Sequence, residues 1–249
     1  MPVAYARFLI GRQRSYRADR QLGWSLAFVA GAINAGGFLA VGQYTSHVTG
    51  AVSSVTDHLI LGDFALAATA AAAVTAFLLG AMTCAIMVDI AQRRDLTSEY
   101  ALPLLLEALL ILAFGLAGAR LTQSRALLLP ITVALLSFLM GLQNAMVTKL
   151  SERVIRTTHM TGIVTDLGIE LGKLVYWNRR REGLPPVLAD RERIRVLGGL
   201  LLAFAVGGLT GAFGFKHTGY GFSVPIALVL AVLALVPAVD DARRLSARQ

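Results

Sequence analysis

The stretch FALAATAAAAVTAFLLGAMTCAIMVDIA, residues 64–91, determines the class of protein that this chain forms. It carries one charged residue, Asp89, and it exceeds the roughly 20 apolar residues that a helix needs to cross a bilayer core about 30 Å thick. Other stretches meet the same length, namely residues 22–42, 101–119, 126–148, 196–215 and 220–239. The sequence therefore predicts an all-α integral membrane protein with six transmembrane helices.

The composition agrees with this class. Of the 249 residues, 56% are hydrophobic and 15% are charged, whereas soluble domains have about 25% charged residues and about 45–50% apolar ones. The single cysteine, Cys84, excludes a disulfide framework and a cysteine-based metal cluster. The sequence has no P-loop, zinc-protease or nucleophile-elbow motif. We therefore expect no enzyme activity, no cofactor and no metal site.

The positive charges predict the orientation of the chain. Segments 1–21, 92–100, 149–195 and 240–249 hold 20 of the 23 Lys and Arg residues, and the segments between the other span ends hold 3. Lys and Arg gather on the cytoplasmic side of membrane proteins. We therefore expect a basic cytoplasmic segment over residues 1–21, a cytoplasmic tail over residues 240–249, and no nucleic-acid partner for the net charge of +8.

Two short motifs recur in the two halves of the chain. Gly31-Ala-Ile-Asn34-Ala35 returns 110 residues later as Gly141-Leu-Gln-Asn144-Ala145. His47-Val-Thr49-Gly50 returns 112 residues later as His159-Met-Thr161-Gly162. The recurrence predicts two structural repeats, over residues 22–119 and 126–239.

Each H-x-T-G motif opens a segment that is too short to cross a bilayer upright, residues 49–61 and 161–175. These segments are typical of re-entrant or interfacial helices. Each half then has three spans, and because three is odd the second half enters the membrane with the opposite orientation. This is an inverted repeat, the plan of many secondary transporters. Alternatively, both short segments cross, which gives eight spans and parallel halves but weakens the charge bias.

The motifs resemble those of the YoaK-type family, bacterial multi-span membrane proteins filed as a domain of unknown function. The G-L-Q-N-A run at 141–145 and the T-H-M-T-G run at 158–162 carry the resemblance, which extends over about residues 22–240. The first half has Asn34 where the pattern favours an aspartate, and this removes a possible charge. The resemblance implies a multi-pass protein of the bacterial inner membrane and names no activity.

The repeated polar residues are the candidate solute-binding residues. Asn34 and Asn144 lie deep in their spans, where an amide without a partner costs roughly 2–7 kcal/mol; interhelical bonding is the other interpretation. The threonines of the motifs are suited to cap a short helix, whose positive dipole end attracts anions. We therefore predict that Asn34, Asn144 and the two Thr-Gly pairs, Thr49-Gly50 and Thr161-Gly162, converge near the centre of the bundle.

Four further residues are candidates for proton-linked roles. His47 and His159 occupy equivalent motif positions and could shuttle protons. Glu107 lies inside the third span, where a carboxylate is expensive and is a functional candidate by default. Asp166 follows the second H-x-T-G motif closely, whereas Glu170 has Lys173 three residues away and predicts an ordinary helix-surface ion pair.

These patterns predict a small-solute transporter or channel-like protein that takes a polar or anionic solute. The alternative is a membrane scaffold that does not transport and binds lipid or a partner through the basic loop over residues 173–195. Besides the lipid bilayer and the solute, the sequence identifies no partner and no oligomeric state.

Overall fold

A computed structural model describes residues 16–96, 98–120, 125–150, 160–176 and 185–246. The helices have the following bounds: α2 Tyr16–Val41, α3 Val48–Leu61, α4 Phe64–Arg93, α5 Ala101–Arg120, α6 Arg125–Leu150, α7 Met160–Val175, α8 Arg191–Thr218, a 3-10 turn η1 Gly219–Phe222, and α9 Ser223–Ser246. No β-strand occurs among these described residues. The prediction of an all-helical fold is confirmed.

Five helical ranges are long and apolar enough to cross a membrane, which makes the chain compatible with a multi-pass membrane protein. Three of them are α2, α4 and α5, and the fourth, Leu128–Lys149, lies within α6. The fifth, Arg191–Leu235, has 45 residues and joins α8, η1 and the first half of α9. At 1.5 Å per residue, α8 and α9 are each longer than a bilayer core about 30 Å thick.

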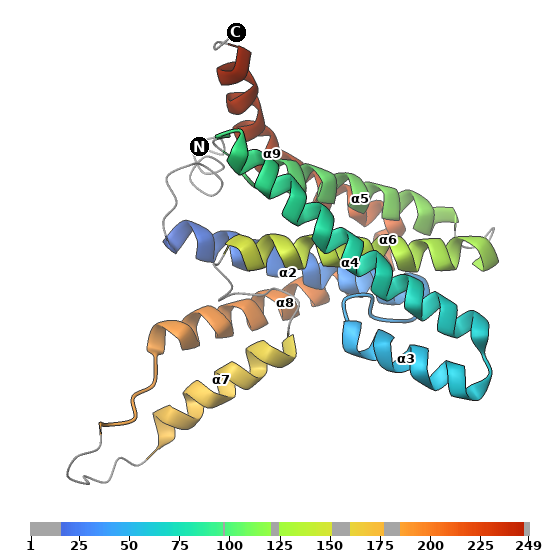
Figure 1. Ribbon diagram of the computed structural model, residues 1–249, viewed down its shortest axis with the longest axis horizontal. Helices are drawn as coiled ribbons and strands as arrows, with labels where there is room; N and C mark the ends of the chain where they lie inside the picture. The colour runs from blue at the N-terminus through green and yellow to red at the C-terminus, as the bar shows by residue number, and fades with distance from the viewer. Residues whose placement is uncertain (1–15, 97, 121–124, 151–159, 177–184, 247–249) are drawn as a thin grey trace.

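The helices pack in pairs that join the two halves of the chain (Figure 1). Helix α2 packs along α8, α4 packs along α6, and α5 packs along α9. Helices α2 and α6 also touch. Every long helix of the first half therefore has its main partner in the second half, so neither half encloses a core by itself.

Close backbone contacts at glycine hold two of these crossings together. A Cβ atom added to Gly207 would overlap the carbonyl oxygen of Phe28, and one added to Gly31 would overlap that of Phe204. Small residues let membrane helices approach this closely.

The crossing of α4 and α6 has the same construction. A Cβ atom on Gly80 would overlap the Phe138 carbonyl oxygen, and one on Gly141 would overlap that of Phe77. All four positions share the spacing Phe-x-x-Gly in the sequence. The two halves therefore use equivalent residues for equivalent contacts.

Helices α5 and α9 correspond to each other through their prolines. Pro103 and Pro225 are each the third residue of their helix, where the missing N–H has no intrahelical partner to lose. When the two halves are aligned on these prolines, Glu107 of α5 corresponds to Val229 of α9.

The short helices lie outside the six long ones. Helix α3 ends at Gly62, which has φ of +81°, and the backbone N–H of Asp63 donates to the His58 carbonyl at 2.9 Å. This left-handed turn reverses the chain, so α3 packs back along α4. Helix α7 packs on α8 in the corresponding way. Figure 1 shows α3 and α7 well apart, each beside its own partner.

The buried core lies where α2, α5, α6 and α8 meet. Its largest fully buried side chains are apolar or aromatic, and they are Tyr100, Phe114, Leu22, Leu26, Ile33, Leu104, Ile111, Leu136, Leu139 and Met140. The outward faces of the same helices carry exposed leucine, isoleucine and valine. An apolar exterior around an apolar core is the pattern expected of helices that face lipid.

Candidate functional site

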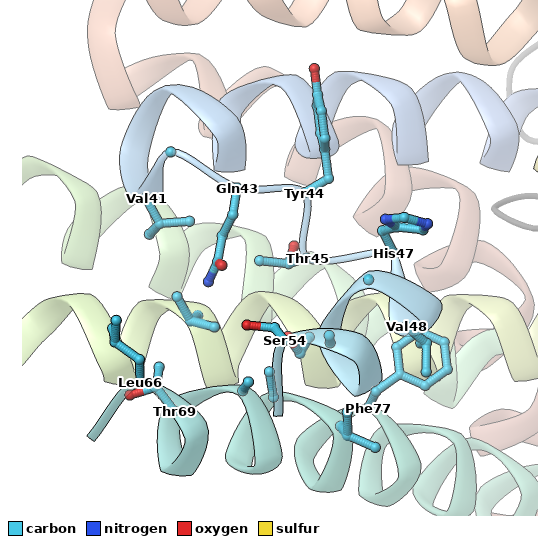
Figure 2. A pocket seen from close by; sticks show the side chains of 18 of the residues that line it. Val41, Gln43, Tyr44, Thr45, His47, Val48, Ser54, Leu66, Thr69 and Phe77 are labelled. Atoms are coloured by element: carbon cyan, nitrogen blue, oxygen red, sulfur yellow. The ribbon is translucent and has the colours of Figure 1, made fainter. Parts of the chain in front are cut away.

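A pocket of about 460 Å³ lies between α3, α4, α6 and the loop that joins α2 to α3. Figure 2 shows Gln43 reaching from this loop toward α4, whereas the ring of Tyr44 turns away. The Tyr44 ring stacks on Phe38 at a centroid distance of 4.8 Å. Many of the lining side chains are polar, namely Gln43, Tyr44, Thr45, His47, Ser54, His58, Thr69 and Ser137.

Ser137 is the deepest polar group of this pocket on α6. It is 1% exposed, and its hydroxyl has no hydrogen-bond partner among the described residues. A serine inside a helix usually donates to the carbonyl four residues earlier, and a buried hydroxyl without a partner costs about 1–3 kcal/mol. The hydroxyl oxygen has less than 1 Å² of accessible surface, so it borders the pocket without being open to it in this structure.

Asn34 holds the loop that covers the pocket. The hydroxyl of Ser46 donates to Asn34 Oδ1 at 2.9 Å. This bond ties the loop to the last part of α2, from which Val41 reaches the pocket wall. Asn34 thus positions the pocket and does not line it. In the second half, Asn144 is half-buried, and its backbone carbonyl accepts from the Thr148 hydroxyl at 2.7 Å.

The two Thr-Gly pairs lie on different short helices that the structure keeps apart. Thr49 and Thr161 are both exposed. Thr49 does not cap α3, because the helix already begins at Val48; His47 is the N-cap residue and makes no side-chain cap bond. The expected threonine cap is therefore wrong for α3. Thr161 likewise lies inside α7, and its carbonyl accepts from the Thr165 hydroxyl at 2.8 Å.

The glycine of the first motif has a clear structural use. A Cβ atom on Gly50 would lie 2.6 Å from His47 Nδ1, so the glycine lets the imidazole fold over the start of α3. Both residues line the pocket. Of the six predicted solute-binding residues, only Gly50 reaches it, and Gly162 is half-buried on α7. His159 lies outside the described residues.

Glu107 is buried in the interface between α5 and α6. Its side chain is 0% exposed, and Gln143 Nε2 donates to its Oε1 at 2.7 Å. The same Nε2 donates to the Leu26 carbonyl at 3.2 Å, so one amide joins α6 to both α5 and α2. Gln143 is also fully buried. The G-L-Q-N-A motif contained this residue, but sequence reasoning singled out its neighbour Asn144.

The acidic residues of α7 form an ion-pair network with α8. Asp166 pairs with Arg193 at 3.0 Å. Glu170 is buried and not on the helix surface as expected; its side chain is 2% exposed and pairs with Lys173 at 2.8 Å. The hydrogen bond from Lys173, followed by that from the backbone N–H of Asp190, lowers the pKa of Glu170 below its ordinary value. These contacts fix α7 to the start of α8.

Sequence reasoning did not find Ser137 or His58 as pocket residues. Ser137 lies among apolar residues of α6, and only the packing of α4 on α6 shows which face of α6 borders the pocket. His58 lies outside the H-x-T-G motif, so the motif did not indicate it. Its Nδ1 is 3.8 Å from Oδ2 of Asp63. The described residues contain no group of three or more His, Cys, Asp or Glu that could hold a metal ion.

The long apolar helices make this all-helical chain compatible with the class of multi-pass membrane proteins. A family model for proteins of unknown function, DUF1275, matches residues 22–236. The chain belongs to this family, and the resemblance to the YoaK-type family is confirmed. Comparison with curated proteins and with solved structures gave no match.

Proposed function

We propose that this protein is a small transporter or channel-like protein of the inner membrane that moves a polar or anionic solute through the pocket bounded by α3, α4 and α6. The observation that carries the proposal is Ser137. Its buried hydroxyl has no partner among the described residues and borders a pocket with several polar lining side chains. A polar cavity in a membrane helix bundle marks a solute pathway. The proposal includes no catalytic step.

The proposed architecture is six spans in two inverted repeats. The reciprocal Phe-x-x-Gly contacts support a twofold relation between the halves, because each contact recurs with exchanged partners. The 45-residue range that joins α8 and α9 supports two crossings there. Helices α3 and α7, at 14 and 16 residues, are about 21 and 24 Å long and do not reach across the bilayer core.

The orientation that we propose places both termini in the cytoplasm. In it, α3 and the pocket face the outside, and α7 faces the cytoplasm. The charge split between the segments supports this arrangement. The solute-binding role predicted for Thr49, Asn144, Thr161 and Gly162 remains a prediction. For Thr161 and Gly162 it would require a second solute-binding position near α7.

The alternative, a scaffold that binds lipid or a partner through the basic loop, has less support. Part of its charge is already used inside the protein, since Lys173 pairs with Glu170 and Arg193 pairs with Asp166. Arg179, Arg180 and Arg181 lie outside the described residues.

Cysteine labelling tests the repeat. In a Cys84→Ala background, Ser53→Cys on α3 and Thr165→Cys on α7 occupy equivalent exposed positions. The inverted repeat predicts that a membrane-impermeant maleimide labels Ser53→Cys only from outside and Thr165→Cys only from inside. Labelling of both from the same side supports the eight-span alternative and contradicts the proposal.

Cysteine labelling also tests the pocket. A small, charged methanethiosulfonate reagent should modify Ser137→Cys from outside, because a solute pathway through the pocket would admit water to this depth. The matched control is Leu139→Cys, two residues along α6 and 0% exposed, which should not react. An unreactive Ser137→Cys, or equal reactivity at both positions, contradicts a solute pathway through this pocket.

A further inference from the structure

The buried carboxyl of Glu107 lacks the partners that a negative charge requires. Oε1 accepts one bond from the neutral amide of Gln143, and Oε2 has no partner among the described residues. No cation pairs with it in the part of the chain that the structure describes. A carboxylate removed from water is stable only when it is paired and hydrogen-bonded.

Gln143 has the complementary defect. Its Nε2 donates to two acceptors, Glu107 Oε1 and the Leu26 carbonyl, so the amide cannot be rotated without facing oxygen with oxygen. This fixes Oε1 of Gln143 as an acceptor, and that atom has no donor among the described residues. The site therefore contains two buried oxygens without a hydrogen between them.

One proton removes the first defect and provides the kind of group that the second one needs. A proton on Glu107 Oε2 removes the buried charge and converts an acceptor into a donor. Gln143 Oε1 is an acceptor without a donor among the described residues. A neutral carboxylic acid and a primary amide are complementary, since each provides one donor and one acceptor.

The second buried glutamate shows the opposite solution. Glu170 is 1% exposed, yet it pairs with Lys173 and accepts from the backbone N–H of Asp190 at 2.9 Å. Arg193 Nη1 is also 3.8 Å from its Oε1. These donors stabilise an ionised carboxylate. Burial is alike at the two sites, and only the partners differ.

The helices packed against Glu107 place no charged side chain of the described residues in a pair with its carboxyl. On α4, Cys84 is buried and interacts electrostatically with the carboxyl, while Asp89 pairs with Lys149 of α6. Helix α9 contributes apolar buried residues, namely Ile226, Ala227, Leu230 and Ala234. Helix α2 contributes the Leu26 carbonyl.

We infer that Glu107 and Gln143 form a proton-binding site within the bundle, with the proton held on Glu107 Oε2. Release transfers this proton to water and leaves a carboxylate, so it requires water to reach the α5–α6 interface. A pocket with polar lining residues lies at Ser137, six residues from Gln143 along α6, or about 9 Å. Coupling of this proton to solute movement rests on the proposed function; binding of the proton does not.

Infrared spectroscopy of the protein reconstituted in lipid tests the site directly. At pH 7 the wild-type chain should show the C=O stretching band of a protonated carboxyl, and Glu107→Gln should lose it. Glu170→Gln is the matched control and should retain the band. Gln143→Leu should shift the band to higher wavenumber, because Oε1 loses its hydrogen-bond donor.

Several outcomes overturn the inference. A wild-type spectrum without a protonated carboxyl band at pH 7 does so without any variant, even if Glu107→Gln fails to fold. Identical wild-type and Glu107→Gln spectra do the same. Loss of the band when sodium chloride replaces choline chloride assigns the site to a metal cation instead. A negative solute screen with a positive infrared result rejects transport and leaves the proton site standing.

Discussion

The α5–α6 interface and the corresponding place between α9 and α2 differ in both packing and chemistry. Glu107 and Gln143 meet at the first, and the equivalent positions of the repeat hold Val229 and Ile33. Helices α5 and α6 pack closely. Between α2 and α9 lies an apolar groove of about 570 Å³, which Val229 lines.

Ser137, which borders the pocket, also has an apolar residue at the corresponding position of the other half. Ser137 of α6 corresponds to Ala27 of α2, which is also fully buried. The glycine crossings, in contrast, are alike in both halves. The comparison teaches that the two halves share their glycine crossings, whereas Glu107, Gln143 and Ser137 have apolar residues at the corresponding positions.

A large side chain at a crossing glycine should disrupt folding equally in either half. Gly31→Leu and Gly141→Leu drive a side chain into a facing carbonyl, and we expect each to abolish folding, beyond the about 1–3 kcal/mol of ordinary overpacking. Size-exclusion chromatography in detergent measures this. Gly168→Leu is the control, because nothing lies within 4 Å of a Cβ atom there. Normal folding of Gly141→Leu would show that the crossing is not as close as described.

Loss of the Glu107–Gln143 hydrogen bond should lower the stability of the protein. Gln143→Leu leaves Glu107 buried without its donor, and we expect a loss of about 1–3 kcal/mol in unfolding free energy. The double variant Glu107→Val, Gln143→Ile copies the α9–α2 side and should regain most of that loss, because both polar partners are removed together. Thermal unfolding in detergent measures both. A double variant less stable than Gln143→Leu argues against the pairing.

The hydroxyl of Ser137 should have little effect on stability. Ser137→Ala removes a group without a partner and should change the unfolding free energy by at most about 0.5 kcal/mol. The mirror change, Ala27→Ser, adds a hydroxyl to a closed position and should cost about 1 kcal/mol. If Ser137→Ala proves the more destabilising of the two, the hydroxyl has a protein partner that this account lacks.

The smallest effect concerns the attachment of α7 to α8. Because its partners lower the pKa of Glu170, the contribution of the ionised group is present above the ordinary glutamate pKa of about 4.3. It is lost as the pH falls through the lowered value. The difference in unfolding free energy between wild type and Glu170→Gln should be constant from about pH 5 to about pH 8, since this whole range lies above the ordinary glutamate pKa. Below about pH 5 the difference should shrink. A difference that grows on acidification contradicts the ion pairing.

Hydropathy predicted the helices well because length and apolarity are properties of the chain itself. The stretch 64–91 is α4, Phe64–Arg93, and the short segment 49–61 is α3, Val48–Leu61. The family was also predictable from its motifs. These features need no knowledge of which helix lies beside which.

The site could not be predicted in the same way, because it depends on how each helix is rotated. Asn144 and Gln143 are adjacent in sequence, but only Gln143 faces Glu107. Asn34 bonds to Ser46 in the following loop, a contact that no spacing rule indicates. Two short helices with the same motif lie apart because each follows its own long partner.

Solute flux into proteoliposomes tests the central claim, that solute movement depends on the polar pair Glu107 and Gln143 between α5 and α6. We expect the wild-type protein to move at least one solute from a panel of small anions and polar molecules. The folded double variant Glu107→Val, Gln143→Ile should not move it. Equal flux by both proteins, or no flux of any solute by the wild type, would contradict the account.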